Sequence, residues 1–166
     1  MTRYGELKLK VQRFGLGLIT KTKLKPGDTI LVALHSSIDF AVTVLAAQFV
    51  GLKVALANPD YSPQELKHVY KLVKPKKVVI HSKHLTRAVK ANMQTFNVIL
   101  TDTKCGRGGI LWIGELLADE VEAKAAKPYL NTTTHLPSSS GTTGLPIADR
   151  LKELIKYQGS QVASKL

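Results

Sequence analysis

Two patterns of hydrophobic residues alternate along the chain. In some segments they recur with the period of a helix, and in others they form the continuous run of a buried strand. Residues 4–19 carry apolar side chains at helical spacing, namely Leu7, Val11, Phe14 and Leu18. This spacing predicts an amphipathic helix. Residues 29–34 then form an almost unbroken apolar run, which is typical of a strand buried on both faces of a parallel sheet.

Capping signals mark where the next helices begin. Either Ser36 or Ser37 is suited to cap a helix that ends at Gly51. Ser62 and Glu65 form a capping box, with proline at the first helical position between them. Further helices are therefore predicted at residues 63–72 and 85–93.

Three more apolar segments alternate with these helices. They are residues 53–57, 77–81 and 96–100. Strands that alternate with helices indicate βαβ units. The predicted fold class is α/β, a partial doubly wound, mainly parallel sheet with flanking helices.

After residue 102 the regular alternation of predicted strands and helices stops. Residues 103–109 are rich in glycine and predict a loop, and residues 110–126 predict a helix. Residues 131–144 are polar and contain many threonines, serines and glycines, so we expect a long loop.

Composition limits the class of protein. The 166 residues fit one domain, and 44% apolar residues suffice for a core. No apolar run is long enough to span a bilayer, and residues 1–6 do not resemble a secretory signal. The single cysteine, Cys105, cannot form an internal disulfide, so a reducing intracellular compartment is expected.

The net charge of +12 allows a nucleic-acid partner. However, the lysines are scattered and few aromatic residues lie among them, which favours a solvated basic surface. Nucleic-acid binding stays an alternative function, which the sequence disfavours.

One polar segment has the composition of an anion-binding loop. Gly141 and Gly144 permit close approach of the backbone to a phosphate, so that successive N–H groups can converge on one oxyanion. Hydroxyl donors come from Ser139, Ser140, Thr142 and Thr143. The pattern is not a Walker loop, and on composition alone a flexible Ser/Thr/Gly linker is an equal alternative.

The order SSGTTGLP at residues 139–146 resembles the signature loop of the adenylate-forming family, which includes acyl-CoA synthetases, 4-coumarate–CoA ligases and beetle luciferases. Residues 4–7, 25–28 and 57–66 also resemble family segments, in the family's order. The resemblance implies an N-terminal α/β domain over residues 1–146. It assigns ATP phosphate binding to Ser139, Ser140, Gly141, Thr142, Thr143 and Gly144.

After Pro146 the chain departs from the family, because Ile147 and Ala148 replace a lysine and a glycine. Residues 149–159 resemble the hinge that lies far downstream in full-length members. The resemblance places Asp149, Arg150, Lys152 and Lys156 on the hinge and nucleotide side, and Gly159 on the CoA side. The alternative for this segment is a plain amphipathic helix. Residues 147–166 are thus interpreted as a hinge remnant with a C-terminal tail.

By this resemblance the intervening adenine, ribose and acyl-pocket motifs are missing, as is the catalytic lysine of the C-terminal domain. The resemblance implies ligation of a carboxylic acid to CoA through an acyl-adenylate, using ATP, AMP, Mg²⁺ and CoA. We expect weak or no turnover from a shortened chain and assign no catalytic residue.

Ser164, Lys165 and Leu166 match the address read by the peroxisomal import receptor. A peroxisomal location is therefore expected, and otherwise a cytoplasmic one. A non-catalytic peroxisomal interaction module is a further alternative function.

The histidines are dispersed and lack the spacing of metal ligands, so no metal site is predicted. His35 stands out because it ends a predicted parallel strand, where ligands often bind.

Overall fold

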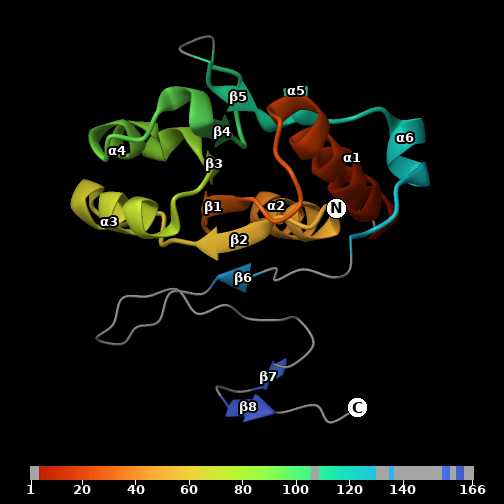
Figure 1. The fold of residues 1–166 in the computed structure, drawn as a ribbon, viewed down its shortest axis with the longest axis horizontal. Helices are drawn as coiled ribbons and strands as arrows, with labels where there is room; N and C mark the ends of the chain where they lie inside the picture. Colours follow the sequence, from red (N-terminus) through yellow and green to blue (C-terminus); the bar gives the residue numbers. More distant parts are fainter. Residues whose placement is uncertain (1–3, 106–108, 130–134, 137–154, 158–159, 163–166) are drawn as a thin grey trace.

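A computed structural model describes residues 4–105, 109–129, 135–136, 155–157 and 160–162. Its centre is a six-stranded sheet in the order β5-β4-β3-β1-β2-β6, in which all neighbouring strands are parallel (Figure 1). The strands are β1 Thr29–Ala33, β2 Lys53–Leu56, β3 Lys77–Ile80, β4 Val98–Leu100, β5 Leu111–Trp112 and β6 His135–Leu136. The predicted mainly parallel sheet is confirmed.

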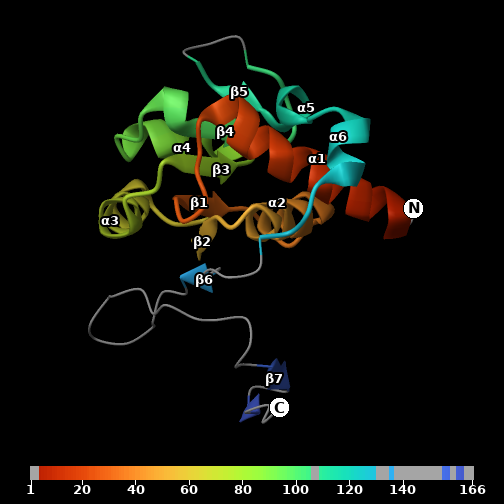
Figure 2. The ribbon, with the colours of Figure 1, turned by 45° about the vertical axis from the view of Figure 1, so that its right-hand side comes forward.

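Helices cover both faces of this sheet, as Figure 2 also shows. They are α1 Tyr4–Thr22, α2 Ile38–Phe49, α3 Pro63–Val73, α4 Leu85–Lys90, α5 Ile113–Leu116 and α6 Glu120–Ala125. Helices α1, α2 and α5 pack on one face, and α3 and α4 pack on the other. This is a doubly wound arrangement. No helix in the described ranges is long and apolar enough to cross a bilayer.

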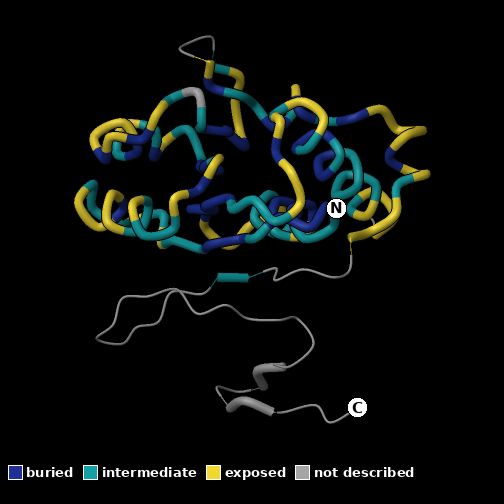
Figure 3. The backbone as a smooth tube through the Cα atoms, viewed as in Figure 1, coloured by how far each residue is buried: buried dark blue, intermediate teal, exposed yellow. Residues whose placement is uncertain are grey.

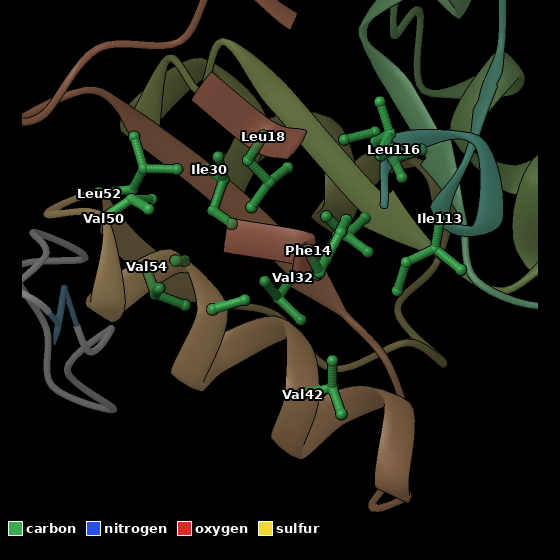
Figure 4. Close-up of a cluster of buried hydrophobic side chains, with 14 of the residues drawn as sticks. Phe14, Leu18, Ile30, Val32, Val42, Val50, Leu52, Val54, Ile113 and Leu116 are labelled. Atoms are coloured by element: carbon green, nitrogen blue, oxygen red, sulfur yellow. The ribbon is translucent and has the colours of Figure 1, made fainter. Parts of the chain in front are cut away.

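The two cores explain the unbroken apolar run of β1. Ile30 and Val32 face α1, where they pack in one cluster with Phe14 and Leu18 (Figure 4). Alternate residues of the strand, Leu31 among them, join the cluster on the opposite face. Successive strand residues point to opposite faces, so a strand covered on both sides needs apolar side chains throughout. Most residues of the central strands are accordingly buried, as the dark blue parts of the tube in Figure 3 show.

The capping signals are confirmed. Ser37 is the N-cap of α2, and its side chain accepts a hydrogen bond of 3.1 Å from the Phe40 N–H. Ser62 and Glu65 form the predicted capping box at the start of α3. In both places the side chain satisfies a backbone donor that the first helical turn leaves unpaired.

The predicted helix over residues 110–126 is wrong. Leu111 and Trp112 instead form β5 beside β4, and two short helices follow. The Ala118 N–H donates to the Arg13 carbonyl of α1 at 2.9 Å, so it is not available for a continuous helix. Asp119 then caps α6 by accepting the Val121 N–H at 2.7 Å.

Two predictions near the C-terminus also need correction. The polar segment 131–144 is not wholly a loop, because His135 and Leu136 pair with Val54 and Ala55 of β2. Ile155–Tyr157 forms strand β7, which pairs with β8, Ser160–Val162, in a separate antiparallel sheet. The alternative of a continuous helix across the hinge segment therefore fails at residues 155–157.

Candidate functional site

Polar side chains gather at the carboxyl ends of the central strands. His35 follows β1, Asp60 follows β2 and His84 follows β3. The chain runs from β1 outward to β2, and then returns past β1 to β3 on its other side. In doubly wound sheets, ligands bind at the carboxyl edge where the strand order reverses in this way. The reversal here lies between β1 and β3.

The ends of β3 and β4 are tied together by Asp102. The backbone N–H of Ser82 donates to Asp102 Oδ1 at 2.8 Å, and the Ser82 hydroxyl donates to Oδ2 at 2.5 Å. His81 Nδ1 lies 3.5 Å from the same carboxylate. Partial burial raises the pKa of Asp102, but the hydrogen bonds from Ser82 and the nearby His81 outweigh it and lower the pKa overall. Asp102 is therefore a fixed anion that joins two strand ends.

A second cluster lies between the ends of β1, β2 and β3. His35 Nε2 is 3.6 Å from Asp60 Oδ2, and the rings of His35 and His84 have centroids 5.5 Å apart. Arg87 Nη1 lies 3.4 Å from Asp60 Oδ1 and 3.5 Å from His84 Nδ1. Burial, with smaller contributions from Lys83 and Arg87, lowers the pKa of His84, while Asp60 opposes the shift. These effects together favour the neutral form of the His84 ring.

Strand β6 leads directly into the predicted phosphate loop. Its register pairs His135 with Val54 and Leu136 with Ala55, parallel to β2. Gln48 Nε2 of α2 lies 3.0 Å from His135 Nδ1, which links this edge strand to a helix. Because β6 is parallel to β2, it is directed toward the carboxyl edge of the sheet, and Leu136 lies beside Ala55, one residue before the end of β2. Strand β6 is thus directed toward the edge at which α/β sheets bind ligands.

The other predicted site residues lie mostly outside the described residues. These are Ser139, Ser140, Gly141, Thr142, Thr143, Gly144, Asp149, Arg150, Lys152 and Gly159, and the terminal Ser164, Lys165 and Leu166. Lys156 is described as part of β7, paired with Gln161 of β8. The assigned roles of all these residues stay predictions, as do the peroxisomal location and the division at residue 146.

Sequence reasoning singled out His35 but missed its partners. Asp60 and His84 are 25 and 49 residues away from it along the chain, so spacing in the sequence gives no hint of a cluster. A usable signal did exist, because each of the three residues closely follows a predicted strand. The carboxyl ends of parallel strands share one edge of the sheet.

Comparison with known proteins supports the resemblance seen in the sequence. The family model described as "AMP-binding enzyme" matches residues 2–146. A 4-coumarate–CoA ligase of Humulus lupulus is 32% identical over 86% of this chain and 26% of its own length. The 4-coumarate–CoA ligase of Vanilla planifolia is 31% identical over 86% of this chain and 27% of its own length. The chain thus spans about a quarter of the length of these curated relatives.

Solved structures agree with this fold. The luciferase-like enzyme from the nonluminescent mealworm Zophobas morio matches 86% of this chain and 34% of its own, with a TM-score of 0.72 and 25% identity. A benzoate CoA ligase from Burkholderia xenovorans matches 81% of this chain and 27% of its own, with a TM-score of 0.63 and 18% identity. At that identity the second likeness shows the fold alone. The nucleic-acid and interaction-module alternatives find no support among these relatives.

Proposed function

Because this chain belongs to the AMP-binding enzyme family, we propose that it binds the phosphates of ATP through residues 139–144 as part of acyl-adenylate chemistry. The observation that best supports this is the strand before the loop. Strand β6 is parallel to β2 and is directed toward the carboxyl edge of the sheet, with Leu136 one residue short of the level at which β2 ends. A loop that follows such a strand starts where α/β sheets bind ligands.

The residues of the loop suit a polyphosphate. Gly141 and Gly144 let backbone N–H groups converge on an oxyanion, and the intervening threonines add neutral hydroxyl donors. Mg²⁺, when bound with the nucleotide, would supply positive charge that offsets the charge of the phosphates. Ile147 and Ala148 add no cation beside the loop, so we expect ATP affinity to depend strongly on Mg²⁺.

The proposed reaction joins a carboxylic acid to CoA through an acyl-adenylate. The names of the curated relatives, 4-coumarate–CoA ligases, favour an aromatic acid as the substrate class. The chain corresponds to about a quarter of those relatives. We therefore propose that its own turnover is slow and that nucleotide binding is the property it retains.

Calorimetry of the full chain with Mg-ATP tests this proposal. We expect binding that weakens at least tenfold in the double variant Thr142→Val/Thr143→Val, a loss of about 1.4 kcal/mol. The matched control is Thr132→Val/Thr133→Val, which makes the same chemical change in the same polar segment but outside the motif. Equal affinities of both double variants, or no binding of Mg-ATP by the unaltered chain, would contradict the proposal.

A further inference from the structure

We propose that His35, Asp60 and His84 form a binding site for a divalent transition-metal ion of the Zn²⁺ type, at the carboxyl edge of the sheet. The site uses no residue of the phosphate loop. It goes beyond the proposed function, which requires no metal at these side chains.

The geometry is close to that of a coordination shell. One nitrogen from each histidine and one carboxylate oxygen of Asp60 all lie within 4.8 Å of one another. The His35–Asp60 pair is already at 3.6 Å. With bonds of about 2.0–2.1 Å, the ligands of a tetrahedral Zn²⁺ ion lie about 3.3 Å apart. Small side-chain movements of His35 and Asp60 would close the remaining gap.

Burial divides the cluster into one fixed ligand and two adjustable ones. His84 is only 6% exposed, and its Nε2 has no hydrogen-bond partner among the described residues. A buried polar atom without a partner is costly. The other ring nitrogen, Nδ1, lies 3.5 Å from Arg87 Nη1, which also contacts Asp60, so this buried ring borders the cluster. The side chains of His35 and Asp60 are 47% and 57% exposed, so they are free to rearrange around an ion. The site is thus anchored on one side and open to solvent on the other.

The donor set indicates which metals fit. Imidazole nitrogens suit Zn²⁺, Cu²⁺, Ni²⁺ and Co²⁺, whereas Mg²⁺ and Ca²⁺ prefer sites built from oxygen. Two imidazoles and one carboxylate match the three-ligand sets of open zinc sites, in which water fills the fourth position. The exposed side of this cluster leaves room for that water.

Arg87 occupies the cluster when no metal is bound. Its guanidinium contacts both Asp60 and His84, and it also donates to the Pro59 carbonyl at 3.2 Å. A metal ion would have to displace this positive charge from the Asp60 carboxylate. The Arg87 side chain is 43% exposed and can swing into solvent. Arg87 is therefore a tethered cation that competes with the metal, and its removal should tighten metal binding.

The position in the fold supports a ligand site. His35 follows β1 and His84 follows β3, the two strands between which the strand order reverses. Loops on the two sides of such a reversal diverge, which leaves a crevice between them. Both imidazoles thus stand at the edge position where doubly wound sheets bind ligands.

Titration of the full, untagged chain with Co²⁺ and then Zn²⁺ tests the site, with visible absorption and calorimetry as the readouts. Co²⁺ should give absorption bands of low-symmetry coordination that Zn²⁺ abolishes, with one ion per chain. His35→Ala and Asp60→Asn should each weaken binding at least tenfold. Both positions are exposed, so these variants should fold normally. Arg87→Gln should strengthen binding several-fold.

His68→Ala is the matched control, because His68 is exposed on α3 and lies outside the cluster. It should leave metal affinity unchanged. The proposal is overturned if the unaltered chain binds neither metal. It is equally overturned if His35→Ala binds as tightly as His68→Ala, or if Arg87→Gln weakens binding. No nucleotide is present in this experiment, so its failure would leave the phosphate-loop proposal untouched.

Discussion

Asp28 at the amino edge of the parallel sheet and His84 at its carboxyl edge differ in whether their polar atoms have hydrogen-bond partners. At the amino edge, Asp28 accepts a hydrogen bond from Lys76 Nζ at 2.7 Å and another from the Lys25 N–H at 2.8 Å. Two backbone hydrogen bonds lie at the same edge. The Lys53 N–H donates to the Asp28 carbonyl, and the Gly27 N–H donates to the Gly51 carbonyl. At the carboxyl edge, His84 keeps a buried nitrogen unpartnered within the described part of the chain.

This difference separates groups that stabilise the fold from groups that are available to a ligand. A buried polar group that is fully hydrogen-bonded contributes to stability, whereas one without a partner costs free energy unless something binds it. The two edges share the same strands and the same two cores. Their difference therefore arises from the residues just outside the strands, and substitutions there can test it.

The largest loss of stability is expected from forcing apart helices α1 and α5, which pack together on one face of the sheet. A Cβ atom at Gly17 of α1 would lie 1.3 Å from the Leu116 carbonyl oxygen of α5. The two helices would have to separate, so Gly17→Ala should lower the free energy of unfolding by about 3 kcal/mol or more. Urea denaturation followed by circular dichroism measures this change.

Gly5→Ala is the control for that variant, since a Cβ atom there meets nothing within 4 Å. The same substitution should leave stability unchanged or raise it by at most about 1 kcal/mol, because alanine favours a helix over glycine. If the two glycine variants unfold alike, the close contact between α1 and α5 is not as described.

The second-largest loss of stability is expected at the amino edge of the sheet, where Asp28 accepts its two hydrogen bonds. Asp28→Asn removes the charge from two hydrogen bonds and should cost about 1–2 kcal/mol of stability at pH 7. Glu122→Gln, an exposed change of the same kind on α6, should stay within about 0.5 kcal/mol of the unaltered chain. Denaturation curves of both variants give the comparison.

The cost of Asp28→Asn should also depend on pH. Burial raises the pKa of Asp28, but the hydrogen bonds from Lys76 and from the Lys25 N–H, with the charges of both lysines, lower it overall. A carboxyl whose pKa is lower when folded stabilises the fold above its unfolded pKa and loses that effect as pH falls through the folded value. The difference between the two proteins should therefore shrink below about pH 4. A constant difference from pH 7 to pH 3 would contradict the ion pair.

The smallest effect concerns the start of α2 at the carboxyl edge. Both serines are exposed, but the Ser37 side chain accepts the Phe40 N–H, whereas Ser36 makes no hydrogen bond to any residue that the structure describes. Ser37→Ala should cost about 1 kcal/mol, and Ser36→Ala should cost close to nothing. Thermal melts of the two variants measure these costs. If Ser36→Ala is the more destabilising change, Ser36 and not Ser37 is the N-cap of α2.

The sequence predicts best what neighbouring residues decide. The capping box of Ser62 and Glu65 and the run of β1 are local signals, and both are confirmed. Strands β5 and β6 are two residues each, and they depend on partners far away in sequence, Ile99 for Leu111 and Val54 for His135. No local pattern shows such pairing.

The candidate sites divide in the same way. The predicted phosphate loop can be recognised from the sequence because its glycines and hydroxyl residues are consecutive. His35, Asp60 and His84 each follow a different strand, so the sequence places them at one edge of the sheet, but their proximity depends on which strands are neighbours.

Hydrogen–deuterium exchange of the full chain, with and without Mg-ATP, tests most directly whether the carboxyl edge is the ligand-binding edge. We predict slower exchange in peptides that cover residues 137–146 and the adjoining end of β2, with no change at residues 25–29 and 74–77 of the amino edge. Slower exchange confined to the amino edge, or none in residues 137–146 under saturating Mg-ATP, would contradict the account.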